Sequence, residues 1–192
     1  QNFTLSFRNV NASMCGELIK GRNRLLSNRA NIIFVGSGYE NTLMRVCSQN
    51  HEGETNCYEK PTNKTSEEVL KLIGTAFVDI KGKNYGLLSV EPFKDNKNKF
   101  NFWYVKKLTS LDECNDLDGL CPGSVYMPLA ENCPYGNKYV VSVVDNPHST
   151  EPAEAGERMV NIAVDFKIWD SSFSSYSKMF IHEFGHAFAR LG

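Results

Sequence analysis

Short apolar runs along the chain predict buried strands. "NIIFVGSGY" (31–39) contains β-branched and aromatic residues and is closed by glycines, which is typical of a buried strand entering a tight turn. "FNFWYVKKL" (100–108) and "KYVVSVV" (138–144) have the same character and predict two more strands. "RMVNIAVDF" (158–166) alternates apolar and polar positions, which indicates a half-buried strand.

Two other stretches have the periodicity of amphipathic helices. In "TSEEVLKLIGTAF" the apolar residues share one face, and Thr65 with Glu68 forms a capping box. From about Ser174 to Leu191 aromatic and apolar residues again form one stripe, and Ser174 or Ser175 can cap this helix. Weaker patterns predict a helix at 15–27, the start of a helix at 40–48, and loops at 49–64, 109–137 and 145–157.

Strands separated by helices predict one α/β domain with a mixed sheet. Residues 1–30 are polar and predict an N-terminal arm, so the domain is expected to occupy residues 31–192. Hydrophobic residues make up 41% of the chain and the net charge is -1, which favours a globular protein and argues against nucleic-acid binding. No apolar run approaches the roughly 20 residues of a membrane helix, so no membrane span is expected in this chain.

Cysteines and glycosylation triplets indicate an oxidising setting. Gln1 rather than Met opens the chain, which fits a mature form whose signal peptide has been removed. The acceptor asparagines of the three N-x-S/T triplets are Asn2, Asn11 and Asn63. The six cysteines are Cys15, Cys47, Cys57, Cys114, Cys121 and Cys133. We therefore expect an extracellular location, secreted or at the cell surface, with a cytosolic protein of six free thiols as the alternative.

Six cysteines allow 15 connectivities, and we expect three bridges with no free thiol. Short loops favour Cys47 with Cys57, and Cys114 with Cys121 or Cys133. Alternatively, Cys47, His51 and Cys57 are metal ligands. The segment between them is polar and turn-like, which favours a bridged surface loop.

The last predicted helix carries His182, Glu183 and His186 in H-E-x-x-H spacing. Histidines four residues apart project from one helix face, where two nitrogens can bind one Zn²⁺ at about 2.0–2.1 Å. Glu183 lies beside that face, in the position of a general base. Zn²⁺ would polarise a scissile carbonyl and lower the pKa of bound water toward ~7, which suits hydrolysis of a peptide bond. The alternative is a core helix with two satisfied histidines, although two of only four histidines fall in the motif.

Other features of this helix bear on the completeness of the site. Gly185 costs about 0.5–1 kcal/mol relative to alanine in a helix, so it predicts the close approach of another element. Catalytic zinc usually has three protein ligands, but no further residue stands at a spacing that fixes its position. Gly192 suits the left-handed position after a helix, so we expect the third ligand to be an acid just beyond it. Candidates within the chain are His51, His148, Asp145, Asp165, Glu151, Glu154 and Glu157.

Three blocks of the sequence resemble the IgA-peptidase family of zinc metallopeptidases. "RANIIFVGSGYENT" is similar to the family's first strand and turn, "GLLSVEPFKDNKNKFNFWYV" to its S-x-EPF…FN segment, and "HEFGHAFARLG" to its zinc helix. The resemblance covers most of residues 28–192. It implies a secreted or surface peptidase of zincin-like fold, with His182 and His186 as zinc ligands and Glu183 as catalytic base.

The chain departs from the family's pattern at three places. Ser37 stands where the family's turn usually carries an acid, and "DNPHSTEPAEAGE" replaces a glycine-rich stretch. The family's zinc helix continues into an acidic D-E-Y segment, the expected source of the third ligand, whereas Gly192 is the last residue here. We therefore interpret the chain as the N-terminal part of a peptidase domain, completed by a C-terminal portion of the same protein.

The leading functional hypothesis is a zinc-dependent endopeptidase that acts on a protein or peptide substrate. By itself the chain is expected to bind zinc weakly and to show little activity. The alternative is an inactive surface or secreted glycoprotein that keeps the peptidase fold in a structural or binding role. A carbohydrate- or partner-binding module on the aromatic segment 100–105 has less support, because aromatic strands are more often core.

Overall fold

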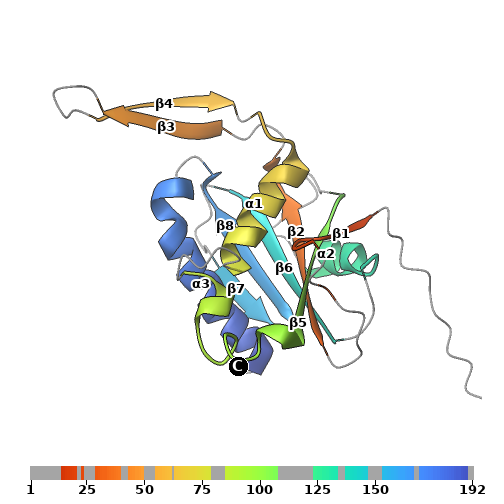
Figure 1. The fold of residues 1–192 in the computed structure, drawn as a ribbon. Helices are drawn as coiled ribbons and strands as arrows, with labels where there is room; N and C mark the ends of the chain where they lie inside the picture. The colour runs from red at the N-terminus through yellow and green to blue at the C-terminus, as the bar shows by residue number, and fades with distance from the viewer. Residues whose placement is uncertain are drawn as a thin grey trace, which may run out of the picture.

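The computed structural model shows a mixed sheet covered by helices on both faces (Figure 1). Four parallel strands form its centre in the order β5 (Phe100–Val105), β2 (Ala30–Ser37), β6 (Asn137–Asp145) and β8 (Met159–Val164). Short antiparallel strands close the edges, β1 (Cys15–Glu17) beside β5 and β7 (Ala153–Gly156) beside β8. The described residues are 14–20, 23, 29–39, 43–49, 55–61, 63–78, 85–107, 123–133, 137–146, 153–166 and 169–189.

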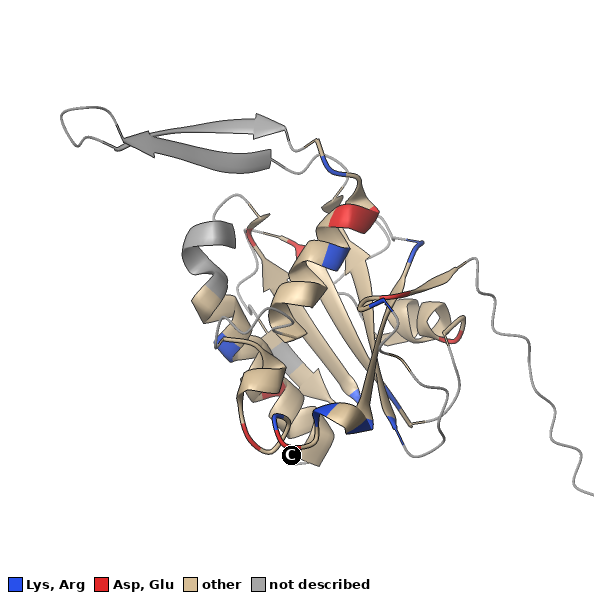
Figure 2. Cartoon of the chain, viewed as in Figure 1, with Lys and Arg blue, Asp and Glu red and all other residues tan. Residues whose placement is uncertain are grey.

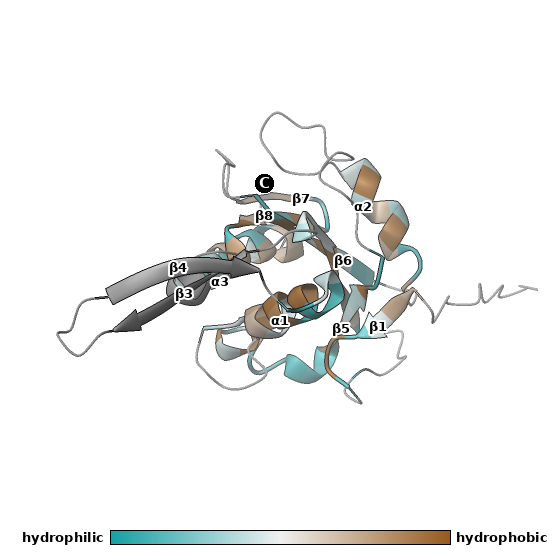
Figure 3. Cartoon of the chain, turned by 90° about the horizontal axis from the view of Figure 1, so that it is seen from above, coloured by the Kyte–Doolittle hydropathy of each residue, from teal (hydrophilic) through white to brown (hydrophobic). Residues whose placement is uncertain are grey.

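Helices α1 (Ser66–Val78) and α3 (Trp169–Ala189) cover one face of the sheet, and α2 (Gly123–Ala130) covers the other (Figure 3). Alternate residues of each central strand therefore enter different cores, as Ile32 and Ile33 of β2 do. Two 3-10 turns, η2 (Leu87–Ser89) and η3 (Lys97–Lys99), precede β5. The predicted α/β class with a mixed sheet is confirmed.

Helix α1 begins as the sequence predicts. The Glu68 carboxylate accepts a hydrogen bond from the Thr65 backbone N–H at 2.7 Å, and the Glu68 N–H donates to the Thr65 hydroxyl at 3.3 Å. The hydrogen bond from the Thr65 backbone lowers the pKa of Glu68. The reciprocal bonds satisfy amide groups that have no partner within the helix, so the capping box is confirmed.

The prediction of a half-buried strand at 158–166 is corrected by the burial of β8. All six residues of β8 are buried, whereas the sequence predicted a half-buried strand. The reason is that helices cover both faces of the sheet, so the polar positions of β8 also lie inside. Asn161 is accommodated there because the Ser142 hydroxyl of the neighbouring β6 donates a hydrogen bond to its side-chain oxygen.

Several weak predictions are wrong. The helix expected at 15–27 begins instead as β1, where Gly16 lies directly over the ring of Tyr104, a contact that leaves no room for a side chain. The helix start at 40–48 and the loop at 49–64 contain the hairpin of β3 (Leu43–Gln49) and β4 (Thr55–Pro61), which extends away from the sheet in Figure 1. The loops expected at 109–137 and 145–157 contain α2 and β7.

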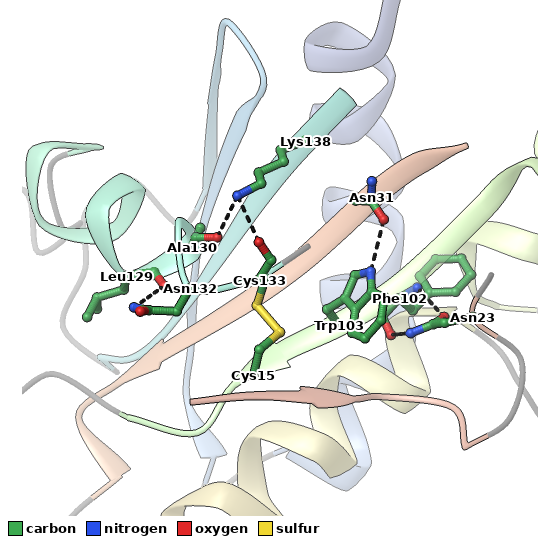
Figure 4. The surroundings of a disulfide bond; sticks show 10 residues. All are labelled: Cys15, Asn23, Asn31, Phe102, Trp103, Leu129, Ala130, Asn132, Cys133 and Lys138. Atoms are coloured by element: carbon green, nitrogen blue, oxygen red, sulfur yellow. Dashed lines mark hydrogen bonds between the residues drawn. A yellow bond between two sulfur atoms is a disulfide. The ribbon is translucent and has the colours of Figure 1, made fainter. Parts of the chain in front are cut away.

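A disulfide between Cys15 and Cys133 joins β1 to the end of α2 (Figure 4). The expected pairing of Cys114 with Cys133 is therefore wrong. Loop length does not indicate the observed bridge, because its two residues are 118 positions apart and meet only through the fold. Figure 4 also shows the Lys138 ammonium donating to the carbonyls of Ala130 and Cys133 at 3.0 and 3.1 Å, which satisfies acceptors at the end of α2. Burial lowers the pKa of Lys138.

Thr65→Ala should destabilise the protein by about 1 kcal/mol, because the replacement removes the hydroxyl that caps α1. Urea unfolding followed by circular dichroism measures the change. The matched control is Thr75→Ala in the middle of α1, where alanine is the better helix former and no loss is expected. Equal destabilisation by the two replacements would contradict the capping role.

The register places Cys47 directly opposite Cys57 in the β3–β4 hairpin. Opposite residues of an antiparallel pair have Cα atoms about 4.5–5.5 Å apart, a separation that a disulfide spans. We expect non-reducing peptide mapping to find Cys15 linked to Cys133 and Cys47 linked to Cys57, which leaves Cys114 for Cys121. The last two cysteines lie outside the described residues. A peptide that links Cys47 or Cys57 to any other cysteine would contradict this arrangement.

Candidate metal centre

Aromatic packing determines how α3 sits on the sheet. Phe180 and Phe184 are fully buried, and Phe180 stacks on Phe77 of α1 with ring centroids 4.9 Å apart. Phe184 and Phe188 both contact Tyr139 of β6, at 5.6 and 5.4 Å between centroids. The predicted apolar stripe is therefore the face that packs inward, although α3 begins at Trp169 rather than near Ser174.

This orientation turns the motif histidines away from the core. Successive helix residues are rotated by about 100°, so Phe188 and His186 point about 160° apart around the axis. Because Phe188 contacts the central strands, His186 points away from the sheet. On β7, Ala153 and Ala155 are the residues that pack toward the core beneath α3. No local pattern in the sequence indicates this edge strand, because its four residues, Ala-Glu-Ala-Gly, have no β-branched or aromatic side chain.

The two imidazoles converge on one point. The Nε2 atoms of His182 and His186 are 3.2 Å apart, and the ring planes lie at 81° to each other. Two nitrogens bound to one tetrahedral Zn²⁺ at 2.0–2.1 Å are separated by about 3.3 Å. The side chains therefore already have the spacing that a shared divalent ion requires, and imidazole nitrogens are preferred zinc ligands. These residues fit the metal that the motif predicts.

Glu183 lies next to this pair. Its Oε1 atom is 3.9 Å from Nε2 of His182. The two side chains differ in exposure, since His182 is 69% exposed and Glu183 only 19%. The histidine is thus open to solvent, while the carboxylate lies against the protein beside it. A carboxylate in this position can accept a proton from a water molecule that approaches the histidines.

The described residues contain no group of three or more His, Cys, Asp or Glu side chains that could hold a metal. Asp145 and Asp165 were candidate third ligands. The Asp165 N–H donates to the Tyr176 hydroxyl, which places Asp165 beside a residue about 9 Å along the helix axis from His182 and about 15 Å from His186. Asp145 is engaged by the Phe166 N–H at 3.1 Å, at the same end of the sheet.

Glu157, a further candidate, is described but forms no such group with the histidines. The remaining candidates, His51, His148, Glu151 and the side chain of Glu154, lie outside the described part of the chain, and so does Gly192. The expected acidic ligand beyond Gly192 stays a prediction.

The expectation that Gly185 permits the close approach of another element is corrected. A side chain at Gly185 would meet nothing within 4 Å among the described residues, so the expected close approach of another element is wrong there. Gly185 is on the flank of α3 away from the sheet, where packing makes no demand on its size.

The aromatic segment 100–105 is buried throughout, which confirms the core interpretation and removes the surface that a carbohydrate-binding role needs.

Of the expected glycosylation sites, Asn63 is exposed just before α1, and Asn2 and Asn11 lie outside the described residues. No helix in the described ranges is long and apolar enough to cross a bilayer. Comparison of the chain with known protein families, curated proteins and solved structures finds no match.

We predict that the full-length protein binds one Zn²⁺ and that His182→Ala and His186→Ala each abolish this binding, because both nitrogens hold the same ion. Metal analysis after equilibrium dialysis measures the stoichiometry, and circular dichroism checks the fold. His51→Ala and His148→Ala are matched controls that should keep the metal. Absence of equimolar zinc in the wild type would overturn the site. Loss of zinc in a control variant would show instead that the third ligand lies within these 192 residues.

Proposed function

We propose that the chain is part of an extracellular zinc-dependent endopeptidase of the zincin-like type. The observation that carries the proposal is the 3.2 Å separation of the two histidine Nε2 atoms on an outward face of α3. The alternative interpretation of the motif is a core helix whose two histidines are satisfied by hydrogen bonds. It does not fit the His182 side chain, which is 69% exposed. The resemblance of three sequence blocks to the IgA-peptidase family supports the same class of activity.

His182 and His186 would hold the metal through Nε2. When bound, Zn²⁺ supplies a Lewis acid that polarises a carbonyl group and makes water more acidic. Glu183 would take a proton from the attacking water at Oε1 and pass it to the leaving amine. Its closeness to His182 supports this role, because a general base must lie within reach of the proton that it removes.

The outer edge of β7, next to α3, supports a peptide as the substrate. Among the described strands β7 pairs only with β8, so its other edge has backbone groups without a strand partner. An extended peptide can add to such an edge through main-chain hydrogen bonds, largely independent of its sequence. Because α3 contacts β7, a segment bound along this edge would lie beside the helix that carries the histidines. This arrangement favours a cleavable protein or peptide chain over a small ester or amide.

Two structural features are compatible with an extracellular location. The Cys15–Cys133 bridge belongs to the class of bonds that persist in oxidising compartments. Asn63 is exposed just before the first turn of α1. Detection of a glycan on Asn63 in protein purified from its natural source tests this part of the proposal.

Glu183→Gln should leave zinc binding and the fold unchanged but reduce peptide hydrolysis by about 10²–10⁴-fold or more, because loss of a general base removes proton transfer in the transition state. Cleavage of an unfolded protein by the full-length enzyme, followed by mass spectrometry, measures the change. Glu131→Gln, an exposed replacement after α2, is the matched control and should retain activity.

Equal activity of wild type and Glu183→Gln would refute the assigned role. A full-length protein that binds zinc at both histidines but cleaves no unfolded protein or peptide would support an inactive binding or structural glycoprotein instead.

A further inference from the structure

A second concave site lies on the opposite flank of α3 from the histidines. It is a pocket of about 480 Å³ at the end of the sheet where β5, β2 and β6 begin. Its apolar wall consists of Phe93, Phe100, Tyr139 and Phe188, with Ala30 from the first position of β2. Volumes of about 300–1,000 Å³ with mainly apolar and aromatic lining are typical of ligand pockets in proteins.

The aromatic wall is well packed. Phe93 makes edge-to-face contacts with Phe100 and Phe188, at 5.8 and 5.4 Å between ring centroids. Phe93 and Phe100 are buried beneath the surface, at 5% and 3% exposure. Ala30 leaves space between these rings that a larger side chain would occupy. The pocket therefore depends on the small side chain of Ala30 and on the mutual contacts that hold the aromatic rings in place.

The rim of the pocket is polar and carries one charge. Lys99, Asn96 and Asn137 line the opening, and no acidic residue in the described part of the chain does. The Lys99 ammonium has no ion-pair partner among the described residues, while the Asn96 amide donates to the carbonyl of Pro92. Lysine and arginine residues gather along this end of the sheet in Figure 2. An apolar interior below the Lys99 ammonium complements a ligand with a hydrocarbon body and one anionic group.

The pocket is separate from the candidate metal centre. Phe188 is only two residues beyond His186, yet the two side chains point about 160° apart around the helix. A ligand in the pocket would contact the last turn of α3 without covering the histidines. The pocket is therefore not the place where the proposed peptidase would hold the peptide bond that it cleaves.

We propose that this pocket binds an amphipathic carboxylate, with its hydrocarbon part against Phe93, Phe100 and Phe188 and its carboxylate at Lys99. The same chemistry occurs in a free alkyl or aryl carboxylic acid and in a hydrophobic residue at the C-terminus of a peptide. The proposal does not depend on zinc or on peptidase activity.

Isothermal titration calorimetry of the full-length protein tests the pocket with two pairs of probes. The first pair is 4-phenylbutyrate and its neutral amide, and the second is N-acetyl-Gly-Gly-Phe with a free or an amidated C-terminus. We expect at least one free carboxylate to bind and its neutral counterpart to bind more weakly. Binding by only the first acid identifies a small amphiphile as the ligand type, and binding by the peptide acid identifies a chain terminus.

Three variants locate the binding. Lys99→Gln should weaken the carboxylate about fivefold, the upper range for an exposed ion pair, whereas Lys97→Gln, outside the lining, should have no effect. Ala30→Leu should reduce binding at least tenfold by filling the pocket, with thermal unfolding as the check on its fold. His182→Ala should leave binding unchanged, which separates this site from the metal centre.

Either of two results would overturn the proposal. One is the absence of detectable binding by both carboxylates. The other is binding that the neutral amides match or that Lys99→Gln and Lys97→Gln reduce equally, because the cation at the rim would then have no part in recognition.

Discussion

The contact between the aromatic side chains of α3 and the sheet is the interaction on which the candidate centre depends. Phe180 lies between Phe77 and Phe34, at 4.9 and 6.0 Å between ring centroids, and Phe184 packs on Tyr139. Burying a phenylalanine contributes about 1.5–3 kcal/mol, so rotation of the helix by one residue would expose several such contacts. The rotation of α3 is thereby determined, and the motif histidines must point outward, away from the sheet.

The sheet beneath α3 is a rigid support because both of its faces are covered. Its buried polar side chains bond to one another across adjacent strands, as Asn101 of β5 does with Asn31 of β2 at 3.0 Å. Asn31 also accepts a hydrogen bond from the Trp103 indole, so its buried oxygen is well satisfied. The disulfide and α2 hold the far face. The two candidate sites therefore lie at the margins of the sheet. The histidines are on the exposed flank of α3, and the pocket is at the strand ends.

Local patterns in the sequence predicted those elements whose signal is local. The capping box located α1, and the apolar runs located β2, β5 and β6. The spacing of His182 and His186 predicted their convergence, because four residues make about one helical turn. Other features depend on distant partners: β7 is a strand only because β8 lies beside it, and Cys15 meets Cys133 across 118 residues. A third metal ligand would also come from a distant part of the chain, so no local residue spacing in the sequence identifies it.

The proposed chemistry depends on one metal ion that the two histidines of α3 share. Anomalous scattering measured at the zinc absorption edge, on crystals of the zinc-loaded full-length protein, tests it most directly. We predict a single strong peak about 2.0–2.1 Å from Nε2 of both His182 and His186, with Glu183 beside it and not among its ligands. A peak bound to only one of these histidines, or located elsewhere in the molecule, would show that the two histidines do not share a metal ion.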